Sequence, residues 1–106
     1  MQVNQQNNSA MNVNANLFRG IEAVGGKMHI TSEVLKFEPH SINIQSQPLS
    51  IRIADIAVVE KRNTLLIVPN GITVKDKSGQ EYKFVVNKRD NVISHINAMI
   101  AAVPGN

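Results

Sequence analysis

The chain of 106 residues is long enough for one domain and too short for two. It contains no cysteine, which excludes disulfide bonds and cysteine-ligated zinc. The formal net charge of +3 is small, so charge alone gives little reason to expect a polyanionic partner. Three Phe, one Tyr and no Trp are present, so aliphatic residues must form the core, and the many Ile and Val residues favour strands.

The N-terminus lacks the basic and apolar regions of a secretory signal, and no apolar run is long enough to span a bilayer. The lack of cysteine also fits a reducing compartment. We therefore expect a cytoplasmic protein. Peripheral contact with the inner face of the membrane is the alternative that stays open.

Residues 1–16 contain six Asn and three Gln and no charged side chain. Such a segment can bury little apolar surface, so we expect a flexible tail, with folding on a partner as the minor alternative. The rest of the chain divides into a domain at 17–103 and a short C-terminal end at 104–106.

The first half of the domain shows the alternation of apolar and polar residues that indicates β-strands. The alternation starts at Leu17 and reaches Gly25-Gly26, which we interpret as the first turn because glycine accepts positive φ. A polar turn is expected at Thr31-Ser32-Glu33, followed by a strand that contains Leu35 and Phe37.

The middle of the domain shows a change of phase. A short strand is expected over 42–44. Apolar residues then keep one parity as far as Ile53, whereas Ile56 and Val58 share the opposite one. Because a slip of one residue would turn apolar side chains to the wrong face, we predict a bend or bulge at Ala54-Asp55.

The end of the domain contains the clearest signals. Pro69-Asn70-Gly71 is a turn sequence, and Asp76–Gly79 separates two alternating runs as in a β-hairpin. The period then changes to 3.6, which predicts an amphipathic helix over Lys88–Ala102 with Asn87 as its N-cap. The apolar stripe of this helix consists of Val92, Ile93, Ile96, Met99, Ile100 and Val103.

This order of elements, many short antiparallel strands and then one amphipathic helix, predicts a mainly β fold. The apolar stripe of the helix needs a surface to cover, and the open end or face of the sheet is the available one. We expect a curled antiparallel sheet or small barrel capped by the single C-terminal helix.

Several segments, in order, resemble the bacterial GRAM-domain proteins, which belong to the pleckstrin-homology-like superfold. The segment 20–27 resembles the first hairpin of that family, and 31–37 resembles its turn followed by Leu-x-Phe. Further similar segments lie at 40–45, 51–56, 69–71 and 84–89. One departure is visible, because relatives often carry an aromatic residue, commonly Trp, at the start of the last helix, where this chain has Asn91-Val92.

The resemblance implies a fold more than a function. Relatives bind phosphoinositides, other lipids or proteins, so it implies a non-catalytic binding module without a cofactor. We expect a protein-interaction adaptor whose partner, pathway and oligomeric state the sequence does not identify. The alternative is a peripheral membrane module that binds anionic lipid weakly through basic loops.

The residues themselves suggest no catalytic or metal site. His29, His40 and His95 are widely spaced, with no pairing typical of a metal site. No serine stands in a nucleophile motif with an ordered His and Asp. The chain also lacks the basic recognition helix and interleaved aromatics of nucleic-acid binders, so we expect neither an enzyme nor a nucleic-acid partner.

Basic residues form only loose groups. Lipid-binding pleckstrin-homology domains concentrate Lys and Arg in the first hairpin, where this chain has Lys27 alone, flanked by apolar residues and Arg19. If an anionic surface is contacted, we expect the contact residues to be Lys27, Lys61, Arg62, Lys75 and Lys77, with the last four in or beside turns.

Overall fold

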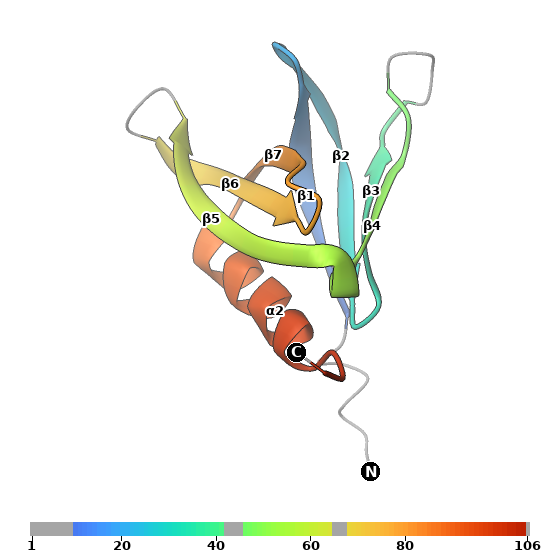
Figure 1. Cartoon of the computed structure of the whole chain (residues 1–106). Coiled ribbons are helices and arrows are strands. Elements are labelled where there is room, and N and C mark those ends of the chain that lie inside the picture. Colours follow the sequence, from blue (N-terminus) through green and yellow to red (C-terminus); the bar gives the residue numbers. More distant parts are fainter. Residues whose placement is uncertain (1–9, 42–45, 65–67, 106) are drawn as a thin grey trace.

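The computed structural model describes residues 10–41, 46–64 and 68–105. They form a seven-stranded antiparallel sheet in the order β4-β3-β2-β1-β7-β6-β5, followed by one helix. The elements are β1 (Ala10–Arg19), β2 (Glu22–Thr31), β3 (Val34–Pro39), β4 (Leu49–Arg52), the 3₁₀ turn η1 (Ile53–Asp55), β5 (Ile56–Thr64), β6 (Val68–Asp76), β7 (Glu81–Val86) and α2 (Arg89–Ala101). The sheet curls into an open half-barrel, and α2 covers one end of it (Figure 1). The predicted fold class is confirmed.

The core lies between the inner face of this sheet and α2. Phe37 and Phe84 meet in it with ring centroids 6.0 Å apart, and aliphatic side chains surround them. Val92, Ile96 and Met99 of α2 are buried, and the other residues of the predicted apolar stripe pack partly against the same core. The helix begins and ends within one residue of the predicted limits.

The predicted tail is shorter than expected. Residues 10–16 form most of β1, which pairs with β2 along its whole length and lies in the middle of the sheet. The prediction of a flexible segment is wrong for these seven residues, because Met11, Val13 and Ala15 supply a core-facing row between outward-facing asparagines. Residues 1–9 lie outside the described residues.

The first turn is also displaced from its predicted place. It lies at Gly20-Ile21, and Gly20 has the positive φ of 64° that a tight turn uses. Gly25-Gly26 lies inside β2, so the interpretation of these glycines as a turn was wrong. Gly26 is needed because a Cβ there would lie 2.8 Å from Cζ of Phe37, against the neighbouring strand β3.

Further turns are partly as predicted. The turn after β2 is confirmed, since the Thr31 hydroxyl accepts hydrogen bonds from the backbone of Glu33 and Val34. The bend at Ala54-Asp55 is confirmed as η1. The pairing of β5 with β6 then shifts after Ile56, so the buried residue is Val59 and not Val58 as its parity suggested.

The remaining differences concern the second half of the chain. Pro69-Asn70-Gly71 lies within β6, so it is not a turn, and the strand predicted over 42–44 lies outside the described residues. The hairpin at Asp76–Gly79 is confirmed. Lys88, with a φ of 54°, occupies the N-cap position predicted for Asn87. No helix of the described chain has the length and apolar character needed to cross a membrane.

Candidate functional site

Two of the candidate basic residues are neutralised by carboxylates. The Lys61 ammonium lies 3.3 Å from Asp90 at the start of α2. Lys75 lies 3.2 Å from Glu60 and 3.6 Å from Glu81. The hydrogen bond and charge of Glu60, with the charge of Glu81, raise the pKa of Lys75 above its ordinary value. These lysines therefore offer little net charge to a ligand.

The candidate residues of the second half do not form one patch. Lys61 and Arg62 lie within β5 and not in a loop, and the successive residues of a strand point to opposite faces. Lys75 pairs with Glu60, which precedes Lys61 in β5 and therefore points to the other face, so Lys75 lies on the face opposite Lys61. Arg62 stacks over Phe18, 5.5 Å from the ring centroid, and donates to the carbonyl of Phe84 at 3.5 Å. Lys77 stays exposed in the β6–β7 turn.

The histidines serve local structure. His29 bonds the side chain of Asn12, and His95 Nε2 lies 3.3 Å from the carbonyl oxygen of Ile30. The backbone N–H of His40 donates to Gly25 at 3.0 Å. Among the described residues, no three His, Asp or Glu side chains come close enough together to hold a metal ion.

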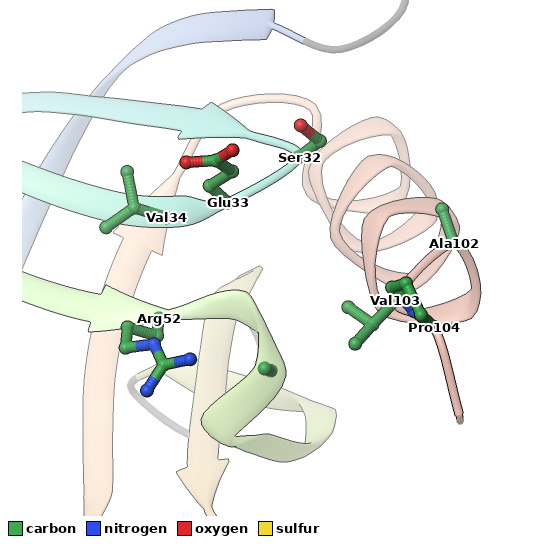
Figure 2. Close-up of a pocket in the computed structure, with 8 residues that line it drawn as sticks. Ser32, Glu33, Val34, Arg52, Ala102, Val103 and Pro104 are labelled. Carbon is green, nitrogen blue, oxygen red and sulfur yellow. The ribbon is translucent and has the colours of Figure 1, made fainter.

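One hollow in the described surface lies beside the C-terminal end of α2 and has a volume of about 480 Å³ (Figure 2). Its lining comes from the β2–β3 turn, from β4 with η1, and from the chain after α2. The lining residues are Ser32, Glu33, Val34, Arg52, Ala54, Ala102, Val103 and Pro104. Glu33 and Arg52 are its only charged residues, and both are exposed, so the hollow has no buried polar group to orient a ligand.

A second hollow, which we call the β1 notch, arises because β1 is longer than β7. β1 pairs with β7 only over Ala15–Phe18, so within the described chain residues 10–14 pair with β2 alone. An opening of about 310 Å³ lies at this free edge. The β1 notch is lined by Met11, Asn12, Val13, Asn14, Lys27, Asn87, Lys88, Asn91 and Val92.

The β1 notch carries positive charge. Lys27 and Lys88 are exposed, and neither has an ion-pair partner in the described part of the chain. None of the described residues that line the notch is acidic. Glu38 of β3 stands opposite Lys27, and Asp90, two residues after Lys88, already pairs with Lys61.

Of the anionic-contact residues predicted from sequence, the β1 notch contains only Lys27. Sequence reasoning missed Met11, Asn12, Val13 and Asn14 because it placed 10–16 in a tail. The alternation of Met11, Val13 and Ala15 with asparagines was the signal that could have revealed β1.

No protein-family model and no curated protein sequence matches this chain. Solved structures do match. The C-terminal domain of an unknown protein from Leishmania infantum has a TM-score of 0.75 and 20% identity, over 86% of this chain and 82% of that one. The pleckstrin-homology (PH) domain of human oxysterol binding protein-related protein 11 has a TM-score of 0.68 and 13% identity, over 92% and 88%. The chain has a pleckstrin-homology-like fold.

A third similar structure contains a ligand. The PH domain of Slm1 was solved with D-myo-inositol-4-phosphate, and it matches with a TM-score of 0.60 and 11% identity, over 86% of this chain and 94% of that one. Identities this low show a shared fold alone. Function must therefore be argued from the surface of this chain.

Proposed function

We propose that this chain is a non-catalytic, GRAM-type interaction module of the cytoplasm that binds an extended segment of a partner protein at a free edge of its sheet. The observation that carries this proposal is the open sheet. β4 and β5 are its terminal strands, and β1 is unpaired on one side over 10–14 in the described chain. Free strand edges present backbone N–H and C=O groups that an added strand can pair with.

The distribution of charge favours a protein partner over a lipid head group. Lys61 and Lys75 are already paired with carboxylates, and Arg62 is held over Phe18. The tip of the β1–β2 hairpin presents Ile21, which is fully exposed, and then Glu22, instead of a cluster of basic residues. A tight inositol phosphate site needs several converging cations.

Weak, peripheral binding to anionic membranes is the second candidate. The exposed Ile21 at the hairpin tip could insert among lipid head groups, and the similar Slm1 domain has a phosphorylated inositol ligand. Such binding would be sensitive to salt, because it would depend on exposed lysines.

Selection of random seven-residue peptides on the immobilised full chain tests the proposal. We expect selected peptides to lose affinity at least tenfold when alternate backbone nitrogens are methylated, because main-chain hydrogen bonds supply the affinity in strand addition. Methylation at the intervening positions should have little effect. Failure to select any peptide would refute the adaptor function, and salt-sensitive sedimentation on phosphatidylserine vesicles would then support the membrane function.

A further inference from the structure

We propose that the β1 notch is the docking site of this domain and that its ligand is an extended acidic segment of a partner protein. The proposal rests on the function proposed above, since it names the edge that accepts the strand and the chemistry of the strand that binds.

The difference in length between β1 and β7 leaves one side of residues 10–14 unpaired in the described chain. β7 ends at Val86, opposite Ala15, and the left-handed conformation of Lys88 turns the chain away into α2. An added strand would therefore lie beside residues 10–14 of β1, in the position that β7 would occupy if it were longer. The five unpaired residues 10–14 correspond to about 16 Å of strand, enough to pair with a segment of about five residues.

The other two edges are poorer templates. β4 has only four residues. β5 has nine, but its pairing with β6 shifts near both ends, and such irregularities disfavour regular pairing with a further strand.

The charge of the β1 notch selects an acidic ligand. Lys27 and Lys88 line it, and the other polar side chains that line it are amides, whose N–H groups can donate to carboxylates. Lys27 stands opposite Asn14 on the outer face of the sheet, so its long side chain can pass Asn14 to reach the added strand. Side chains on a strand alternate between faces, so acidic residues at every second position would meet this outer face.

The carboxylate of Glu38 does not occupy Lys27 in the described structure. It stands opposite Lys27 on the side away from the β1 notch, and the two groups are not within ion-pair distance in the described structure. Lys27 therefore remains available to a carboxylate that enters from the notch.

The peptides selected on the full chain provide the probe. We expect the selected pool to be enriched in Asp and Glu. Lys27→Gln/Lys88→Gln should weaken the tightest of these peptides about five- to twentyfold in fluorescence anisotropy, as the loss of two exposed ion pairs implies. The control Lys77→Gln/Lys83→Gln removes the same charge from two exposed lysines outside the notch, and it should change affinity by less than about twofold.

Two further measurements keep the result decisive. Lys27→Glu/Lys88→Glu should shift selection towards peptides rich in Lys and Arg, and amide shifts on peptide binding should centre on residues 11–14. Equal peptide affinity of the two Gln variants, or amide shifts centred on β4 or β5, would overturn the β1 notch as the docking site and leave the adaptor function standing. If no peptide is selected, both proposals fail. In a further contrary outcome, the parent chain and the control variant would bind phosphatidylserine vesicles while Lys27→Gln/Lys88→Gln would not. That result would show that the two lysines contact a membrane, and it would overturn the proposal of an acidic peptide ligand.

Discussion

Gly26 lies inside β2 at a position where a side chain has no space. A Cβ there would lie 2.8 Å from Cζ of Phe37 and 2.9 Å from the carbonyl carbon of Glu38, and it would press on the carbonyl oxygen of Glu38. Two of these three atoms belong to the backbone of β3. A change of rotamer cannot relieve that contact, so Gly26→Ala must separate β2 from β3 or displace Phe37 from the core.

The cost should lie at the upper end of what overpacking produces, about 3 kcal/mol, because backbone has to move. A domain of this size is typically stable by about 5–15 kcal/mol, so the variant should still fold in the cold. The melting temperature should fall by roughly 15 °C, since each kcal/mol shifts it by about 4–8 °C in small domains.

Gly25→Ala is the matched control, because it makes the same change one residue away. Its Cβ would lie 3.2 Å from Asn16 Oδ1 and 3.5 Å from Cδ2 of His40, and both are side-chain atoms that can shift. The free energy of unfolding should stay within about 1 kcal/mol of the parent, helped by the smaller entropy of the unfolded chain. Urea and thermal unfolding followed by circular dichroism measure both variants. Equal stability of the two would refute the close approach of β2 to β3.

Three further predictions follow from the packing and the β6–β7 turn. Ile96 is fully buried in α2, so Ile96→Ala should cost about 2–5 kcal/mol in urea unfolding, and an unchanged midpoint would mean that the helix is not docked. The Ser78 hydroxyl, 2.6 Å from Asp76 Oδ1, is the main cause that lowers the pKa of Asp76, so Ser78→Ala should raise that pKa in a carboxyl NMR titration. The stability that Asp76 contributes above its unfolded pKa should then be lost at a higher pH as acid is added. Identical titrations of the two proteins would contradict this bond. Deleting 1–16 removes the pairing of residues 10–16 with β2 and of Ala15 and Asn16 with β7, so it should abolish cooperative thermal unfolding. An intact transition would show that this part of β1 is dispensable.

Much of the fold could be predicted because its signals are local. The hairpin at Asp76–Gly79 combines turn residues with flanking alternation, and the change of period after Val86 marks the helix. Composition misled where it was weighed above alternation, since the asparagines at 12, 14 and 16 suggested disorder and hid a strand. Gly25-Gly26 misled because glycine serves both turns and close backbone approach, and the sequence does not show which neighbour comes near.

The contact residues were harder to predict because several of the basic candidates are balanced through tertiary contacts. Nothing near Lys61 in the sequence indicates that Asp90, at the start of a distant helix, neutralises it. Arg62 likewise resembles an available cation until Phe18 of β1 is placed beneath it. A basic residue in the sequence therefore becomes a candidate contact only after its carboxylate and aromatic neighbours are known.

The β1 notch depends on a difference in length that no single segment of the sequence reveals. β1 extends five residues beyond its pairing with β7, and it does so because β7 stops where Asn87 and Lys88 lead into α2. The helix must start there for Val92 and Ile96 to reach the core. The same packing that closes one end of the half-barrel thus leaves an unpaired stretch of β1 beside Lys27 and Lys88, and it connects the stability of the fold to the presence of the proposed docking edge.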